Sequence, residues 1–361
     1  MQFIEAAALN DTYDIVAVGS GFGSLFFIKG FLRNRPKAKI LILEWGSFHN
    51  HEWQIENGRN SDISVESAVD NRSDKEWTFT IGVGGGTNCW WAQSPRLHPT
   101  DFALQTKYGV GQDWPLSYDD LVPYYADAER IMMIAGPNDI SAVWHDTPPY
   151  PLPPHNMTTA DRLMKAAMPD RHFSVPNARL SRPVGGRNAC CSSANCWLCP
   201  VDAKFTAENS LGSVLNHPQV DICVSAKVER LETEAGRVRR VLFKQGGRDF
   251  GVSGDLVVLG ANALYSPFIL LRSGIGGHGL GRYLSEKALV KFEVYLKGLK
   301  HYDGGTATTC FNTSLLDGEH RRTRGAVTLY FENRFIFGVR PEFGRWRELL
   351  PISCYIEDIQ Q

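Results

Sequence analysis

The sequence carries almost no net charge and contains no long uninterrupted hydrophobic stretch. Its 38 lysines and arginines nearly balance its 39 aspartates and glutamates, so the formal net charge is -1. Such a balance gives the chain as a whole no attraction for nucleic acid or for an anionic membrane. We therefore expect small-molecule chemistry and no nucleic-acid partner.

The first apolar stretch, at 15–32, is broken by glycines and serines, and neither a basic segment nor a cleavage site flanks it. It has the features neither of a signal peptide nor of a membrane-spanning helix. Four cysteines stand alone in the sequence: Cys89, Cys223, Cys310 and Cys354. Isolated cysteines in a chain of this size are typical of reduced core residues. We expect a cytoplasmic protein, with export alongside a signal-bearing partner as the alternative.

A strand, a glycine turn and a helix are predicted near the start of the chain. The apolar run 13–18 is typical of a buried strand, and the glycine-rich stretch 19–24 leads from it into a helix that begins near Gly23. In a dinucleotide-binding unit, Gly19 would allow the tight turn. Gly21 would let a pyrophosphate approach the backbone at the helix N-terminus.

A second apolar strand, at 39–43, leads directly to Glu44, which lies 23 positions after Gly21. A Rossmann unit has its ribose-binding carboxylate at this place. The order of strand, turn, helix, strand and glutamate therefore predicts a Rossmann-like domain. The alternative is a chance glycine turn followed by an ordinary surface glutamate.

A second glycine cluster stands at 81–91 (IGVGGGTNCWW), and a single Rossmann unit does not need it. We interpret it as backbone that closes on a second part of a large cofactor, with a flexible surface turn as the alternative.

The stretch 52–75 is predicted as loop. Ser117 is the expected cap of a helix that ends before Gly136.

Four cysteines lie close together in 189–200 (ACCSSANCWLCP): Cys190, Cys191, Cys196 and Cys199. Disulfides are disfavoured because adjacent cysteines bridge only with strain. A structural zinc site usually draws on two C-x-x-C pairs, and only one is present here. Irregular thiolate spacing followed by proline favours an iron–sulfur cluster, while zinc and reduced structural thiols remain the alternatives.

Taken in order, these segments resemble the glucose–methanol–choline (GMC) type of FAD oxidoreductase. The resemblance rests on VGSGFGS (18–24), LILEWG (41–46), GVGGGTNCWW (82–91), SPRLHPTDF (94–102), DWPLSYDDLVPYYADAE (113–129), VVLGANALYSPFILLRSG (257–274) and GLGRYLSEKA (279–288). It implies an α/β fold in which a Rossmann-like FAD-binding domain carries a substrate-side domain with an antiparallel sheet. This α+β part would be incomplete in this chain.

The resemblance also implies domain boundaries. The FAD-binding domain would comprise 1–100 and 200–288, a cap or connector with the cysteine cluster 101–199, and the substrate-side sheet 289–361. Strands are expected in this last part at 289–299, 306–313, 326–333, 334–340 and 352–359.

The FAD-binding residues implied by the resemblance are Gly19, Gly21, Gly23, Glu44, Gly85, Gly86, Thr87, Asn88, Val228 and Gly260. Cys89 falls close to the place where some relatives attach FAD covalently. The subgroup with a cluster binds a three-iron 3Fe–4S centre through a double cysteine and a later one, which correspond to Cys190, Cys191 and Cys196. Cys199 is the alternative third ligand, and all four thiolates would hold a 4Fe–4S cluster.

The family's final third, with the histidine pair that takes the substrate's proton, has no counterpart in the sequence, so no catalytic residue is predicted in this chain. We expect a second polypeptide to supply that part, and thus one subunit of a heteromeric enzyme. The expected activity is oxidation of a hydroxyl of a sugar-like substrate by hydride transfer to FAD, with electrons leaving through the cluster to a protein or quinone acceptor. The alternatives are an oxidase of another alcohol or natural-product intermediate that uses O₂, and a non-catalytic electron-transfer or scaffold subunit.

Overall fold

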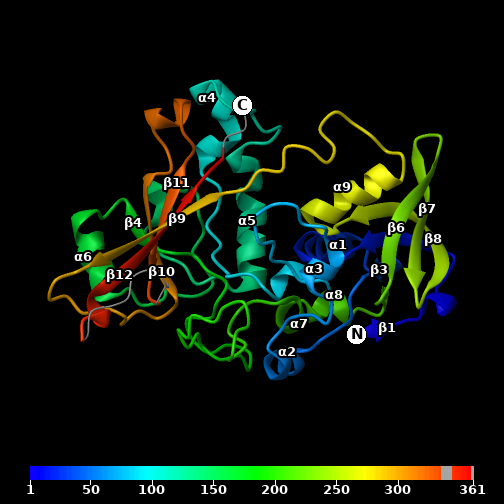
Figure 1. Cartoon of the computed structure of the whole chain (residues 1–361), viewed down its shortest axis with the longest axis horizontal. Coiled ribbons are helices and arrows are strands. Elements are labelled where there is room, and N and C mark those ends of the chain that lie inside the picture. The colour runs from blue at the N-terminus through cyan, green and yellow to red at the C-terminus, as the bar shows by residue number, and fades with distance from the viewer. Residues whose placement is uncertain (335–343, 359–361) are drawn as a thin grey trace. The chain divides into compact units, whose positions relative to one another are not determined.

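The computed structural model describes residues 1–334 and 344–358, which form two compact units (Figure 1). Unit 1 comprises Met1–Trp90 and Thr206–Leu284, and unit 2 comprises Trp91–Phe205 and Ser285–Gln361. Each unit is therefore built from two segments that are distant in sequence. The three-part division expected from the resemblance stays a prediction.

Unit 1 is organised around a seven-stranded sheet with the order β1-β5-β3-β2-β8-β7-β6. Its strands are β1 (Gln2–Phe3), β2 (Thr12–Val18), β3 (Ile40–Leu43), β5 (Val220–Cys223), β6 (Lys227–Glu234), β7 (Arg237–Gln245) and β8 (Arg248–Leu259). Its helices are α1 (Phe22–Asn34), α2 (His51–Asn57), α3 (Val65–Ala68), α7 (Ala207–Ser210), α8 (Gly212–Leu215) and α9 (Asn262–Arg272). The strands from β1 to β8 in this order are parallel, and β8, β7 and β6 continue as an antiparallel meander.

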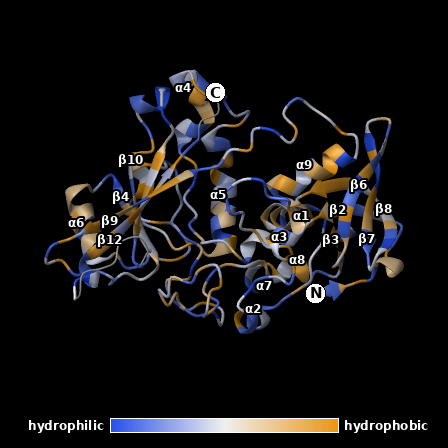
Figure 2. Ribbon diagram, in the orientation of Figure 1, coloured by the Kyte–Doolittle hydropathy of each residue, from blue (hydrophilic) through white to orange (hydrophobic). Residues whose placement is uncertain are grey.

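The centre of this sheet confirms the predicted strand, turn, helix and strand. Every residue of β3 is buried, as parallel strands covered on both faces require. Helix α1 begins at Phe22, close to the predicted position, with Gly21 as its N-cap. Both α1 and α9 are orange along much of their length in Figure 2, which reflects the apolar side chains they bring to the unit.

The stretch 52–75 was predicted as loop, and this was wrong in part, because α2 and α3 lie in or overlap it. The Asn50 side chain accepts a hydrogen bond from the Trp53 amide, and Gly58 ends α2 in the left-handed conformation. The Ser64 side chain caps α3 in the same way. These short helices depend on caps rather than on apolar periodicity, so the periodicity gave no signal for them.

Unit 2 contains a five-stranded antiparallel sheet with the order β4-β10-β11-β12-β9. Its strands are β4 (His172–Ser174), β9 (Ala288–Tyr295), β10 (Thr308–Leu315), β11 (Val327–Glu332) and β12 (Leu349–Ile356). Its helices are α4 (Leu104–Tyr108), α5 (Tyr118–Met132) and α6 (Thr159–Ala167).

Four of the strands predicted after position 288 are confirmed as β9 to β12. The strand predicted at 334–340 lies, except for its first residue, outside the described residues. Strand β4 was not predicted, because its three residues are too short a run to show a period. Helix α5 begins as predicted: Ser117 and Asp120 form a reciprocal capping box at its N-terminus.

Within residues 1–334 and 344–358, no helix is both long enough and apolar enough to cross a bilayer.

Candidate functional site

The glycine turn after β2 is held in a conformation that a side chain would disturb. Gly19 has a φ of 88°, and a Cβ atom there would lie 2.7 Å from the carbonyl oxygen of Gly260. Gly260 is equally constrained, since its Cβ would lie 2.1 Å from the Ser24 Oγ atom. The turn after β2 and the turn after β8 therefore meet backbone to backbone, as two parallel neighbouring strands allow.

The second glycine cluster approaches the same turn. A Cβ on Gly85 would lie 3.0 Å from the Gly21 Cα atom, and Gly85 has a φ of 49°. In contrast, a Cβ on Gly21 or Gly23 would meet no protein atom within 4 Å. Three glycine-bearing segments thus converge and leave open space at the N-terminus of α1, where a phosphate would be favoured.

Glu44 is buried at the end of β3. Its Oε2 atom accepts hydrogen bonds from the Ser20 amide at 3.0 Å and the Ser20 hydroxyl at 2.6 Å. Its Oε1 atom accepts one from the Gly46 amide at 3.1 Å. The ordered carboxylate has further lone pairs with which to accept hydroxyl groups.

These segments surround a cavity of about 310 Å³ within unit 1. Its lining includes eight of the predicted FAD-binding residues, namely Gly19, Gly21, Gly23, Glu44, Gly85, Gly86, Val228 and Gly260. The glycine backbone at the N-terminus of α1 fits the pyrophosphate of a dinucleotide. The Glu44 carboxylate at the end of β3 fits its ribose.

The other two predicted FAD-binding residues have a different position. Thr87 is fully buried, and its hydroxyl accepts a hydrogen bond from the Ala207 amide at 3.0 Å. The Asn88 side-chain amide donates to the Val83 carbonyl at 2.9 Å. Neither lines the cavity. In this structure both side chains hold the glycine loop in place.

The sequence reasoning missed an aromatic wall of the cavity. Trp45 and Tyr265 line it and pack edge to face, with ring centroids 5.1 Å apart. The Lys227 ammonium lies 4.1 Å from the centroid of the Trp45 ring. Trp45 follows Glu44 directly, so its position was a usable signal, whereas Tyr265 reaches the cavity from α9 through the fold alone.

In unit 2, the predicted metal-binding cysteines differ in exposure. Cys191 is exposed, Cys190 is half-buried, and Cys196 and Cys199 are buried. Burial raises the pKa of the Cys196 thiol, and the Cys190 and Cys199 thiolates add to that rise. Cys190 and Cys199 therefore lie near Cys196 on the loop.

A buried cation lies beside this group. Arg179 is 1% exposed, and its Nη1 atom donates to the Cys196 sulfur at 2.7 Å. Its Nε and Nη2 atoms are buried without a hydrogen-bond partner. An incompletely satisfied buried guanidinium next to thiols fits a negatively charged, thiolate-bound centre.

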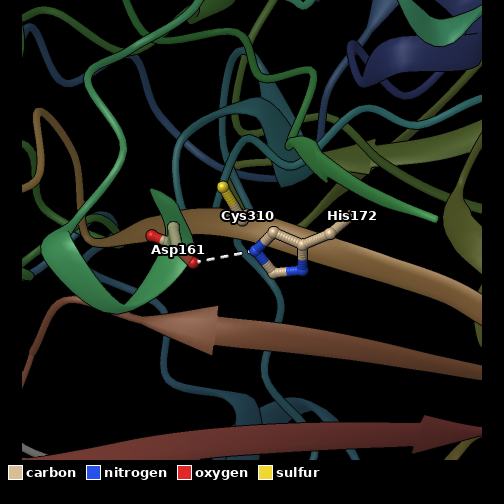
Figure 3. A group of neighbouring side chains, drawn as sticks. All are labelled: Asp161, His172 and Cys310. Carbon is tan, nitrogen blue, oxygen red and sulfur yellow. Dashed lines mark hydrogen bonds and ion pairs between the residues drawn. The ribbon is translucent and has the colours of Figure 1, made fainter. Parts of the chain in front are cut away.

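A second group in unit 2 has the residue types of a metal site. The ligand atoms of Asp161, His172 and Cys310 lie within 4.8 Å of one another, and all three residues are buried (Figure 3). However, Asp161 Oδ2 already accepts hydrogen bonds from the Thr158 amide at 3.0 Å, the Thr158 hydroxyl at 2.7 Å and the Thr309 hydroxyl at 2.5 Å. Asp161 Oδ1 accepts from His172 Nε2 at 3.1 Å. We interpret the group as a hydrogen-bond network that ties α6 to β4 and β10.

Replacing Asp161 with asparagine is therefore expected to lower the free energy of unfolding by about 3–5 kcal/mol, because buried donors lose their acceptor. Chemical denaturation measures this loss. The control is Asp303→Asn, which removes a carboxylate whose side chain is 45% exposed and should cost less than about 1 kcal/mol. Equal losses in the two variants would contradict the structural role of Asp161.

The same network predicts an acid dependence. Burial alone would raise the pKa of Asp161, but hydrogen bonds from His172, Thr309 and Thr158 outweigh it and hold the pKa below 3.8. The ionised carboxylate therefore contributes stability above pH 3.8, and this contribution is lost as the pH falls through the lowered value. Asp161→Asn should show a weaker acid dependence than the wild type.

Three histidines of unit 2, His98, His145 and His301, have surface or packing roles. His98 Nδ1 accepts from the Thr100 amide at 3.3 Å, and exposed His145 pairs with Asp119 at 2.7 Å. His301 Nε2 lies 2.5 Å from the Leu349 carbonyl oxygen.

Comparison with known proteins relates this architecture to enzymes of one family. The chain is 27% identical to the fructose dehydrogenase large subunit of Gluconobacter japonicus, over 89% of this chain and 66% of that one. It is 32% identical to 6'''-hydroxyparomomycin C oxidase of Streptomyces lividus, over 63% of this chain and 45% of that one. The chain thus spans less than two thirds of the length of these relatives.

Solved structures share the fold. A formate oxidase superposes with a TM-score of 0.58 at 16% identity, over 96% of this chain and 73% of that one. Pyridoxine 4-oxidase from Mesorbium loti gives a TM-score of 0.54 at 18% identity, over 95% and 71%.

The family model described as GMC oxidoreductase matches residues 67–288, which is more than half of the 361 residues. The matched region includes the second glycine cluster, the cysteine loop and Gly260. The predicted resemblance is confirmed, and the chain belongs to the GMC oxidoreductase family.

Proposed function

We propose that this chain is the FAD-binding and electron-relay part of a dehydrogenase that oxidises a hydroxyl group of a sugar or sugar-like substrate. The observation that carries the proposal is the cavity of unit 1, whose lining of glycine backbone and the buried Glu44 carboxylate suits a dinucleotide. The similarity to a fructose dehydrogenase large subunit supports a sugar-like substrate.

In this proposal, Gly19, Gly21, Gly23 and Gly260 would hold the FAD pyrophosphate and Glu44 the adenosine ribose. Bound FAD would accept a hydride from the substrate's carbinol carbon. The chain's own contribution is to orient the cofactor and to exclude water from its phosphates. The base that takes the hydroxyl proton is proposed to come from outside this chain.

The cysteine loop would hold an iron–sulfur cluster, with Cys190, Cys191, Cys196 and Cys199 as candidate ligands. Cys190, Cys196 and Cys199 lie on one loop, and Cys196 and Cys199 are both buried, which supports these three as a ligand set. The cationic side chain of Arg179 at the Cys196 sulfur supports a centre with negative charge. A cluster would pass electrons one at a time to an external protein or quinone acceptor.

A second polypeptide is proposed to complete the enzyme. Strand β9 is an edge of the unit 2 sheet, and its side chains Leu289, Val290, Phe292 and Val294 are at least 40% exposed. An exposed apolar edge strand favours association with another chain. The fructose dehydrogenase relative is itself named a large subunit. If this chain, expressed alone, is a soluble, active and flavin-loaded monomer, the proposed partner is refuted.

The activity is tested by comparing electron acceptors, because relatives of this chain include oxidases as well as dehydrogenases. With a sugar or polyol substrate, the purified enzyme should reduce an artificial dye or a quinone under anaerobic conditions and form little peroxide in air. Stoichiometric peroxide without dye reduction would support an oxidase instead. The absence of flavin bleaching by any alcohol substrate in the complete complex would favour a non-catalytic subunit.

A further inference from the structure

Arg179 is a buried cation that bonds directly to the cysteine loop. Its guanidinium is 1% exposed and donates to the Cys196 sulfur at 2.7 Å. Another buried arginine of the same unit, Arg96, pairs with a carboxylate, and Arg179 differs from it in this respect. Arg96 donates to both carboxylate oxygens of Glu129, at 2.7 and 2.8 Å. Within the described part of the chain, Arg179 makes no such bond to a carboxylate.

A second buried cation contacts the same loop. Lys204 is 1% exposed, and its ammonium donates to the carbonyl oxygen of Trp197, the residue after Cys196, at 3.5 Å. His155 is close to Arg179, and burial lowers its pKa to about 4, so it is neutral near pH 7. The surroundings of Cys196 therefore carry two buried positive charges.

A buried guanidinium with two unsatisfied nitrogens, such as that of Arg179, is costly unless an anion lies beside it. A thiolate-bound cluster is such an anion, and it becomes more negative when it is reduced. Because water does not screen buried charges well, nearby cations stabilise the reduced form more than the oxidised form. Hydrogen bonds to the ligating sulfurs act in the same direction.

We propose that Arg179, assisted by Lys204, sets a raised reduction potential for the cluster, so that electrons move from the flavin to the cluster rather than back. Arg179 is a positioning and tuning residue in this role and not a catalytic one. The inference rests on the proposed function, since it requires an iron–sulfur cluster on this loop.

The test is a redox titration of the purified holoprotein, with any chain that co-purifies, monitored by low-temperature EPR. Arg179→Gln removes the charge, Arg179→Lys keeps it, and Lys204→Met removes the second charge. Arg182→Gln is the matched control, because Arg182 lies on the same segment but is exposed, where water screens its charge. Iron and flavin contents are measured for every variant.

R179Q is expected to show about tenfold less reduced cluster at a fixed potential, which is about 59 mV for a one-electron couple. R179K should lie closer to the wild type than R179Q does, and R182Q should match the wild type. K204M should shift in the same direction as R179Q.

An iron-loaded R179Q protein with the wild-type potential would overturn this inference and leave the proposed function standing. If R179Q does not retain its cluster, K204M decides: a lowered potential supports the inference and an unchanged one overturns it. A wild-type protein with flavin but no iron would instead overturn the proposed relay, and this inference with it.

Discussion

Replacing Gly21 with alanine is expected to reduce the flavin content of the purified protein by at least about tenfold. The fold should tolerate the change, because Gly21 has an extended backbone, with a φ of -81°, and an added Cβ meets no protein atom within 4 Å. The methyl group would instead occupy space at the N-terminus of α1 that the cofactor's phosphates need. The ratio of flavin absorbance to protein measures the loss, and the unfolding temperature of the cofactor-free protein should match that of the wild type.

Two further glycines make this result specific. Gly30 lies in the same helix at an exposed position with open space around it. The Gly30→Ala protein should therefore keep its flavin, and its free energy of unfolding should rise by about 0.5–1 kcal/mol. Gly19→Ala should lose both flavin and stability, because it combines a φ of 88° with a contact to the Gly260 backbone. A G21A protein with the wild-type flavin content would contradict the proposed cofactor position.

Replacing Cys196 with alanine is expected to abolish the iron and acid-labile sulfide of the protein, while flavin is retained. Cys196 is buried, forms no disulfide, and its sulfur accepts a hydrogen bond from the Arg179 guanidinium, which would stabilise it as a thiolate ligand. The control is Cys354→Ala, a cysteine of the same unit that is buried to the same degree. Full iron in C196A, or equal loss in C354A, would contradict the predicted site.

Alanine variants of Cys191 and Cys199, on the same loop, distinguish two possible sets of cluster ligands. If Cys190, Cys196 and Cys199 bind a three-iron cluster, Cys199→Ala should lose iron and Cys191→Ala, at an exposed position, should keep it. The opposite result would favour Cys190, Cys191 and Cys196, the set implied by the family resemblance. Loss of iron in both variants would favour four ligands.

The start of the Rossmann unit could be predicted from sequence because its signals are local. β2, the glycine turn, α1 and β3 follow one another within 32 residues, from Thr12 to Leu43, and each has its own pattern. The antiparallel strands β9 to β12 were likewise evident from apolar runs between polar turns.

The rest depends on contacts between distant residues. Asp161, His172 and Cys310 come from three elements, and no pattern in the sequence joins them. Arg179 lies 17 positions before Cys196 and was not singled out. The contact of Thr87 with the cofactor stays a prediction, and the bond that its hydroxyl accepts from Ala207, 120 positions away, could not be read from the sequence. Short local motifs identify the loop, whereas the fold decides which way each side chain points.

Low-temperature EPR of the purified protein, combined with iron, acid-labile sulfide and flavin analysis, tests most directly whether a flavin and an iron–sulfur cluster share this chain. We expect stoichiometric FAD, three or four iron atoms per chain, and an EPR signal that changes when substrate is added anaerobically to the complete complex. A protein that binds FAD and oxidises its substrate without iron would contradict this conclusion.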